Sequence, residues 1–314
     1  MRPAVLLALA VCATAGAVAA CGSSADKSGF ASGDAGSETG SLTGGDSGGS
    51  SSGGSDGSGL ITGDGGTAGH DSGSGAPVAL VYAHSADTLY RMDPTSKQIA
   101  VVGPFGGGAT SVIDLAIDSN ANAYITTSSD FWKVDLQSAA CTFISSGTYP
   151  NSLSFVPKGT LDPNAEALVG YFGSQYIRID TATGAVTNVG NLTGNYQSSG
   201  DIVSVIGGGT FLTVKGGPNN CGDCLLQVDP KTGDLIQDYG SVNHVDVFGL
   251  AFWAGTAYGF DNGGEVFSIG WQNGALVTAN IPVPNPPPNL SFWGAGSTTA
   301  APPMAADGGG IPVQ

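Results

Sequence analysis

One pattern of apolar and small residues recurs five times in this chain. It reads Leu or Val, then a small residue, then a β-branched or aromatic residue, and its copies begin at Leu115, Leu153, Val203, Leu250 and Leu290, at spacings of 38, 50, 47 and 40 residues. A full copy, such as residues 247–281, continues into three more β-type runs separated by Gly- and Asn-rich turns. Such a four-stranded meander has two apolar faces, so it needs further copies on either side to cover them.

The first and last units of the repeat are incomplete in complementary ways. Residues 77–103 contain only the second, third and fourth runs, whereas residues 289–298 contain only a first run. Pairing these two segments completes a fifth unit and removes the open sheet edges. The sequence therefore predicts an all-β fold, a five-bladed β-propeller over residues 76–298 that is closed when the C-terminal strand joins the N-terminal blade. A β-sandwich is the alternative, but it leaves the incomplete units unexplained.

The first 20 residues have the layout of an export signal, with a basic second residue and an apolar run too short to span a bilayer. Residues 18–21 (VAAC) resemble the lipobox of bacterial lipoproteins. The resemblance implies cleavage before Cys21 and lipidation of that residue, and Gly22 after it favours the outer membrane. An ordinary cleaved signal that happens to precede a Cys is the alternative.

Residues 21–75 are rich in Gly, Ser and Asp, and residues 299–314 in Pro, Gly and Ala. Both segments have few large apolar groups to bury, so we expect a disordered linker and a disordered tail. The pattern of the part between them resembles bacterial propeller lipoproteins with NHL-like or quinoprotein-like blades. This resemblance involves no diagnostic motif, so it implies no catalytic residue.

The charge of the chain excludes nucleic acid as a partner, because 25 acidic residues against 9 basic ones give a net charge of −16. No nucleophile elbow or cofactor-binding glycine motif is present, and for nucleophilic catalysis the predicted propeller offers only two histidines, His84 and His244. The sequence predicts no cofactor, apart from the Ca²⁺ considered next.

Polar side chains gather in the loops that lead into the predicted first strands. Because these loops share one face of a propeller, they form the candidate ligand-binding set: Asp114, Tyr149, Asn151, Tyr196, Asp201, His244, Asp246 and Asn289. Asp114, Asp201 and Asp246 offer oxygen ligands for a cation such as Ca²⁺, or hydrogen bonds to a sugar. The alternative is that these residues only satisfy backbone donors at strand entries or solvate the loops.

Three cysteines fall in the predicted propeller. Cys221 and Cys224 lie close together in a loop, and in an oxidising compartment they favour a local disulfide. A redox motif would need a helix N-terminus and a zinc site would need two more ligands. We expect Cys141 to be a buried free thiol.

These features predict a monomeric lipoprotein, anchored to the membrane at the bacterial cell envelope, that acts as a binding or protein-interaction module for an envelope protein or a glycan. The first alternative is a metal-assisted hydrolase or lyase acting on glycans or lactones with carboxylates at the channel mouth. A passive spacer is the second, and it predicts no concave cluster of Tyr149, Tyr196 and His244.

Overall fold

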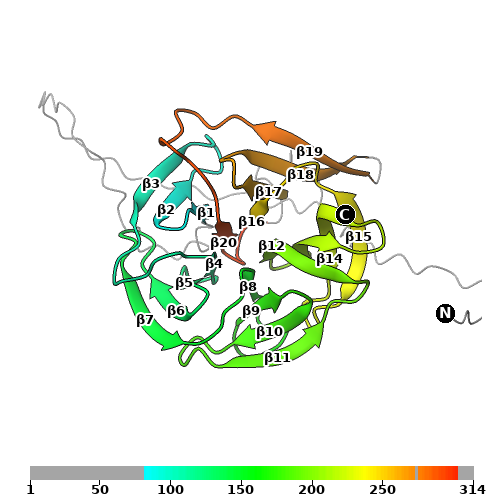
Figure 1. Ribbon diagram of the computed structural model, residues 1–314, viewed down its shortest axis with the longest axis horizontal. Coiled ribbons are helices and arrows are strands. Elements are labelled where there is room, and N and C mark those ends of the chain that lie inside the picture. Colours follow the sequence, from blue (N-terminus) through cyan, green and yellow to red (C-terminus); the bar gives the residue numbers. More distant parts are fainter. Residues whose placement is uncertain (1–80, 273–274, 303–314) are drawn as a thin grey trace, which may run out of the picture. The chain divides into compact units, whose positions relative to one another are not determined.

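Five four-stranded antiparallel sheets surround a central axis in the computed structural model of the chain (Figure 1). The structure describes residues 81–272 and 275–302, which belong to one compact unit. This arrangement confirms the five-bladed β-propeller and excludes the sandwich. The expected signal peptide, the linker and most of the expected tail lie outside the described residues. Within the described ranges, no helix is long and apolar enough to cross a membrane.

Each blade is a meander whose first strand lies innermost. Blade 1 combines β20 (Gly294–Ser297) with β1 (Val81–His84), β2 (Thr88–Met92) and β3 (Ile99–Pro104). Blade 2 contains β4 (Asp114–Ile117), β5 (Ala123–Thr126), β6 (Asp130–Val134) and β7 (Cys141–Ser146). Blade 3 contains β8 (Leu153–Val156), β9 (Ala167–Phe172), β10 (Gln175–Ile179) and β11 (Val186–Asn191). Blade 4 contains β12 (Tyr196–Ser204), β13 (Thr210–Gly216), β14 (Cys221–Val228) and β15 (Leu235–Ser241). Blade 5 contains β16 (Val247–Trp253), β17 (Thr256–Asp261), β18 (Val266–Gln272) and β19 (Ala275–Ile281).

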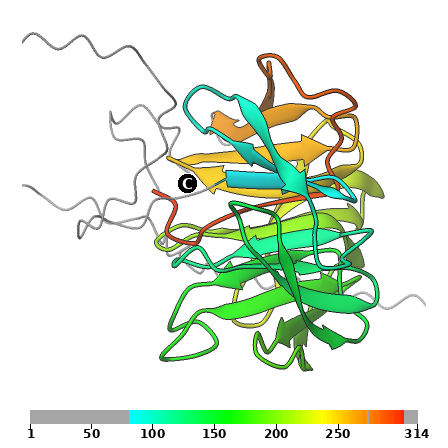
Figure 2. The same ribbon diagram turned by 90° about the vertical axis from the view of Figure 1, so that its left-hand side faces the viewer.

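The ring closes as predicted, because β20 pairs with β1 and places Val81 opposite Ser297 and His84 opposite Gly294. The predicted register of the closing strand is wrong, since β20 begins four residues after Leu290. A Cβ on Gly296 would lie 2.7 Å from the carbonyl oxygen of Leu115, so this part of the axis has no room for a larger residue. Figure 2 shows β20 as the red segment that crosses the middle of the ring.

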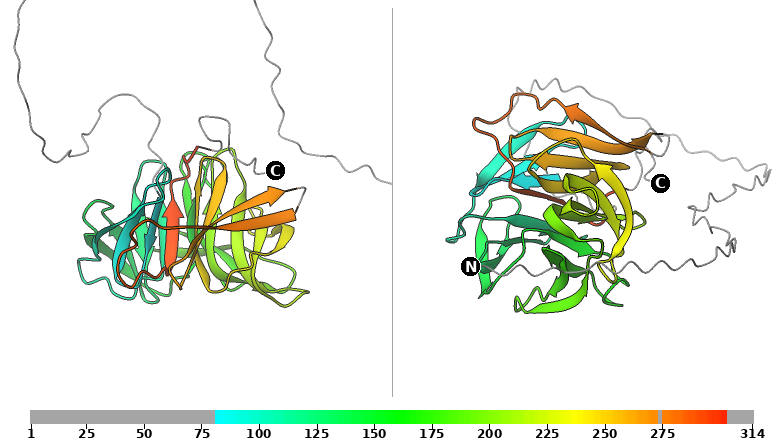
Figure 3. Two further views of the ribbon diagram at one scale, coloured as in Figure 1. Left: turned by 90° about the horizontal axis from the view of Figure 1, so that it is seen from above. Right: turned by 45° about the vertical axis from the view of Figure 1, so that its right-hand side comes forward.

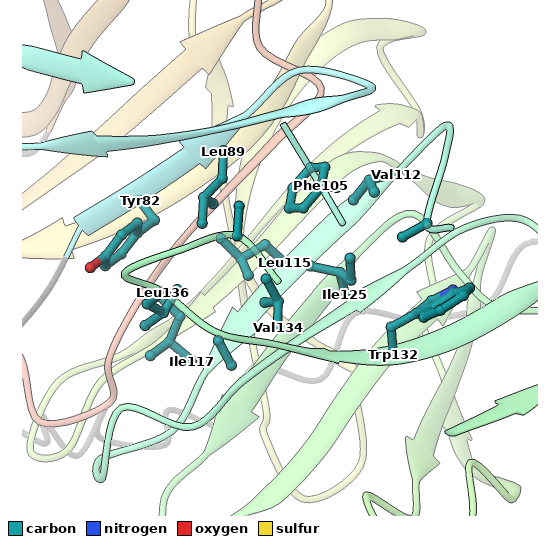
Figure 4. Packing of buried hydrophobic residues seen from close by; sticks show 13 residues of the cluster. Tyr82, Leu89, Phe105, Val112, Leu115, Ile117, Ile125, Trp132, Val134 and Leu136 are labelled. Carbon is teal, nitrogen blue, oxygen red and sulfur yellow. The ribbon is translucent and has the colours of Figure 1, made fainter. Parts of the chain in front are cut away.

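Apolar side chains fill the space between neighbouring blades in five clusters, one for each pair of adjacent blades in the described part of the chain. Figure 4 shows the cluster where Tyr82 and Leu89 of blade 1 meet Leu115, Ile125 and Val134 of blade 2. Each sheet therefore depends on its two neighbours to cover its faces, as the repeat predicted.

These clusters correct the register of one repeat. Leu115, Leu153 and Leu250 each pack against the preceding blade, and in blade 4 this place belongs to Ile202. Val203 packs against the following blade instead. The third copy of the pattern, in blade 4, therefore begins one residue earlier than predicted, and side chains that are one residue apart in a strand face opposite sides of its sheet.

The innermost strands begin at one face of the ring, which we call the entry face, and end at the other, the exit face (Figure 3). The ends of β4 and β20 run parallel, with a bridge between Ile117 and Thr298. On the exit face the chain continues across the axis after β20. The Ile206 N–H donates to the carbonyl of Thr299 (2.9 Å), and Ala301 is buried. The predicted end of the domain at residue 298 is thus too early.

The aspartates that follow the third strands of four blades act as turn formers. Asp93, Asp135 and Asp180 each accept two backbone N–H bonds from the turn that follows, and Asp229 accepts one. In the first three, hydrogen bonds from these turns hold the carboxyl pKa below its usual value. These residues stabilise hairpins and have no further role in the site.

Candidate functional site

Two aspartates meet at the axis near the entry face, and both are fully buried. Asp114 accepts the N–H of Leu115 at 2.7 Å and the N–H of Leu153, in the next blade, at 2.5 Å. Each carboxylate oxygen therefore has a backbone partner, and one carboxylate links blades 2 and 3.

Asp201 repeats this arrangement on the other side of the axis. Its two oxygens accept the N–H of Ile202 at 2.6 Å and the N–H of Leu250, in blade 5, at 2.7 Å. One residue in or directly before each inner strand belongs to an axial layer. Each of these residues directly precedes the residue of its strand that packs against the preceding blade, and together they are Asp114, Ser152, Asp201, Gly249 and Gly294.

The two carboxyl groups influence each other's titration. Burial raises the pKa of both well above the ordinary value, and the charge of Asp201 raises the pKa of Asp114 further. Two buried carboxyl groups that face each other disfavour double ionisation, so the pair takes up a proton more readily than two solvated carboxyl groups do.

His84, at the end of β1, is the third titratable group at the axis. Its Nδ1 lies 2.8 Å from the carbonyl oxygen of Ser85, which only accepts, so Nδ1 carries the hydrogen. Burial lowers the pKa of His84 to about 4. Its Nε2 has no hydrogen-bond partner among the described residues. A Cβ on Gly294 would lie 2.4 Å from this atom and 2.7 Å from Oδ1 of Asp114, so both atoms face the same small space.

We call His84, Asp114 and Asp201 the axial cluster. It can hold a proton, but none of its three side chains is exposed to solvent. Sequence reasoning identified both aspartates and noted His84 only as one of two histidines. The signal that could have found it is its position at the end of the strand that pairs with the closing strand.

The other predicted carboxylate and amides do not join this cluster. Asp246 is exposed and has a left-handed backbone with φ 54°, while Asn151 and Asn289 are also exposed. The expected meeting of Asp246 with Asp114 and Asp201 is therefore wrong, because Gly249 occupies the axial position of blade 5. Asp246 lies three residues before Gly249, ahead of the bulge between Val247 and Gly249 in β16.

The two predicted tyrosines, Tyr149 and Tyr196, are buried, and their hydroxyl groups make hydrogen bonds within the propeller. The Tyr149 hydroxyl donates to the carbonyl of Gly184 at 3.1 Å, and the Tyr196 hydroxyl donates to Asp238 at 2.6 Å. This bond to Asp238 and burial raise the pKa of Tyr196 to about 12. These contacts lie in different blades from His244, so the three residues form no common concave cluster.

His244 instead lies on the entry face of blade 5 beside Asp261 and Glu265, two residues that sequence reasoning missed. Glu265 also lines a groove of about 310 Å³, whose other lining residues are Gly264, Val266, Asn280, Ile281, Pro282, Val283 and Pro286. A carboxylate two strands away in sequence from a histidine carries no motif, so only the fold brings these groups together.

The three cysteines of the propeller form one disulfide and leave one free thiol. Cys221 and Cys224 form a disulfide at the start of β14. Cys141 is free and half-buried, and burial raises its pKa to about 11. A thiol with this pKa is a poor nucleophile at neutral pH.

No protein-family model and no curated protein matches the chain. A solved chain of Kuenenia stuttgartiensis hydrazine synthase matches with 13% identity and a TM-score of 0.36, over 62% of this chain and 60% of that one. A chain of a nidogen/laminin complex matches with 10% identity and a TM-score of 0.48, over 71% and 100%. A symmetrical protein of de novo evolutionary origin matches with 13% identity and a TM-score of 0.42, over 61% and 86%. Such distant matches say nothing about the ligand of this chain.

Proposed function

We propose that the chain is a membrane-tethered β-propeller lipoprotein that acts as a binding or protein-interaction module at the bacterial cell envelope. Its partner, an envelope protein or a glycan, contacts the entry face. The tether rests on the VAAC motif and on Cys21, whose lipidation would anchor the chain to the outer membrane.

Two exposed apolar side chains on the entry face carry this proposal. Trp293 is 40% exposed directly before β20, and Val245 is 76% exposed just before β16. These strands are neighbours at the axis, because a Cβ on Gly249 would lie 2.8 Å from the backbone nitrogen of Ala295. Exposed aromatic and aliphatic side chains on an ordered surface are typical of interaction sites.

The loops that present these side chains are held by backbone bonds. The Trp293 N–H donates to the carbonyl of His84 at 2.7 Å. In the loop that contains Val245, the N–H of Asp246 donates to Asp223 at 2.9 Å. A surface that is already ordered loses little entropy when a partner binds.

The burial of the channel carboxylates supports binding over the hydrolase or lyase alternative. Asp114 and Asp201 have no exposed area, and each of their oxygens is bonded to a backbone N–H. A general base must reach the proton that it abstracts. The spacer alternative predicts the observed separation of Tyr149, Tyr196 and His244, but it gives no reason for the exposed Trp293 and Val245.

A photo-crosslinking experiment in cells tests the binding surface. A photoreactive residue replaces Trp293 or Val245 in the full chain, and the control position is Ile206, which is 47% exposed on the exit face. We expect discrete adducts from the entry-face positions and none from Ile206. We also expect Trp293→Ala to abolish the adduct formed at position 245. Adducts of equal yield on both faces, or none on either, would support the spacer.

Membrane fractionation tests the tether separately. In cells that produce Cys21→Ser, we expect the chain to leave the membrane fraction, because no acylated thiol remains. A Cys21→Ser chain that stays in the membrane fraction would contradict lipidation at this residue, whatever the crosslinking shows.

A further inference from the structure

Three potential metal ligands meet on the entry face of blade 5. His244 comes from the loop between β15 and β16, Asp261 ends β17, and Glu265 lies in the hairpin before β18. The His244 Nδ1 lies 3.7 Å from Oδ2 of Asp261 and 3.7 Å from Oε2 of Glu265. The three ligand atoms all lie within 4.8 Å of one another. Residues far apart in the sequence thus present one nitrogen and two oxygens to the same point.

The imidazole ring is held in one orientation. It stacks on the fully buried ring of Phe267, with ring centroids 3.6 Å apart and an interplanar angle of 2°. The loop of His244 and the hairpin of Glu265 are also joined, because the Asn262 N–H donates to the carbonyl of Asp246 at 3.0 Å. The direction of Nδ1 is therefore built into the fold.

Asp261 is buried and has one oxygen without a hydrogen bond. Its Oδ1 accepts the N–H of Glu265 at 3.0 Å, whereas no hydrogen bond among the described residues reaches its Oδ2. Its side chain is only 9% exposed, yet Oδ2 is not among the fully buried unpartnered atoms of the described residues. This oxygen is therefore open to a water molecule or a cation.

A single N–H does not explain this geometry. The separations of 3.7 Å exceed hydrogen-bond length, and one Nδ1–H cannot point at two carboxylates at once. Ligands bonded to one tetrahedral ion at about 2.0–2.2 Å lie about 3.4 Å apart, so a small inward movement brings all three onto one ion.

We propose that His244, Asp261 and Glu265 form a binding site for a divalent transition-metal ion such as Zn²⁺ or Mn²⁺. A mixed imidazole and carboxylate set suits these ions, whereas Ca²⁺ prefers oxygen ligands alone. Three protein ligands leave coordination positions open, and the Glu265 side chain is 57% exposed, so these positions face solvent.

Of the three ligands, Glu265 also lines the groove described above. A partner or ligand in the groove that carries a carboxylate or another oxygen donor would complete the coordination. The site is distinct from the cation expected at Asp114, Asp201 and Asp246, and it does not depend on the identity of the partner in the proposed function.

Calorimetric titration of the full chain, purified in detergent and stripped with a chelator, tests the site with Zn²⁺, Mn²⁺ and Ca²⁺. We expect one tight Zn²⁺ site, and at least about tenfold weaker binding in His244→Phe and in Glu265→Gln. Asp246→Asn is the matched control, because it removes an exposed carboxylate two residues from His244 and leaves the three ligands intact.

Co²⁺ absorption provides a second measurement that does not depend on heat signals. A d–d band should appear in the wild-type chain and in Asp246→Asn and disappear in His244→Phe. If His244→Phe fails to fold, Glu265→Gln decides the question, because its side chain is exposed. No saturable Zn²⁺ binding, or equal affinity in the wild type and Glu265→Gln, would overturn the proposal.

Discussion

Replacement of Asp201 by Asn removes one acceptor from a fully buried pair of backbone donors. Both oxygens of Asp201 are in use, by the N–H groups of Ile202 and Leu250. In either amide orientation an NH₂ group replaces one of these oxygens and faces a donor. The unpaired N–H and the buried NH₂ each cost about 1–3 kcal/mol, so we expect a loss of about 2–6 kcal/mol. Domains are stable by only about 5–15 kcal/mol.

Urea unfolding at pH 7 measures this loss directly, and a thermal melt should show a decrease of about 4–24 °C for a domain of this size. Asp246→Asn is the matched control, because it makes the same change of charge at an exposed residue and Asn tolerates the φ of 54° there. We expect the control to stay within about 0.5 kcal/mol of the wild type. Equal stabilities of Asp201→Asn and Asp246→Asn would refute the role of Asp201 as a bridge between blades.

The variants Asp201→Asn and Asp246→Asn also test how stability depends on pH, because the pKa of both buried carboxyl groups is raised. The folded chain keeps a proton that the unfolded chain releases above about pH 4. The stability from this proton is fully present below the unfolded pKa and is lost as pH rises through the raised folded pKa. We expect Asp201→Asn to reduce this decline, since one carboxyl no longer faces another. An unchanged decline would contradict the raised pKa of the axial carboxyl groups.

Three further predictions concern the axis and the free thiol. Burial lowers the pKa of His84 to about 4, so the stability that neutral His84 contributes is present above about pH 6.5 and is lost as pH falls towards 4. The variant His84→Asn cannot titrate, so its stability should change less with pH in this window. Gly294→Ala should lower the free energy of unfolding, measured by urea titration, by about 1–3 kcal/mol, because the new Cβ would lie 2.4 Å from the His84 Nε2. Gly222→Ala is the control and should have little effect, because its Cβ would have no atom within 4 Å. Equal effects of the two substitutions would contradict the packing around Gly294. Because burial raises the pKa of Cys141 to about 11, it should react with a thiol reagent at pH 8 about a hundredfold more slowly than in urea, and equal rates would contradict its shielding.

Residue spacing alone was sufficient to predict the number of blades, the closure and the turns. These features follow from local patterns, because alternating apolar residues favour strands and Gly, Asn and Asp favour the turns between them. The incomplete first and last units left one way to complete the ring. The structure accordingly pairs β20 with β1 and places Asp93 and Asp180 in hairpin turns.

The position of each inner strand along the axis followed no such pattern. The sequence placed Asp114, Asp201 and Asp246 in one ring, but Gly249 directly precedes the core residue Leu250 and is axial in blade 5, and Asp246 lies three residues earlier. In the closing strand Gly294 is axial, five residues after Asn289, which precedes the predicted Leu290. The register of an inner strand depends on packing between blades that are distant in sequence.

The sequence by itself thus determined the repeating unit and the way in which its copies close into a ring, because both depend on residues that are neighbours in the chain. Only the tertiary structure decided which polar groups meet. It brought His84 to the two aspartates at the axis and His244 to Asp261 and Glu265 on the entry face. The physical reason is that these contacts join separate strands and loops, so they depend on strand register and on the packing of one blade against the next.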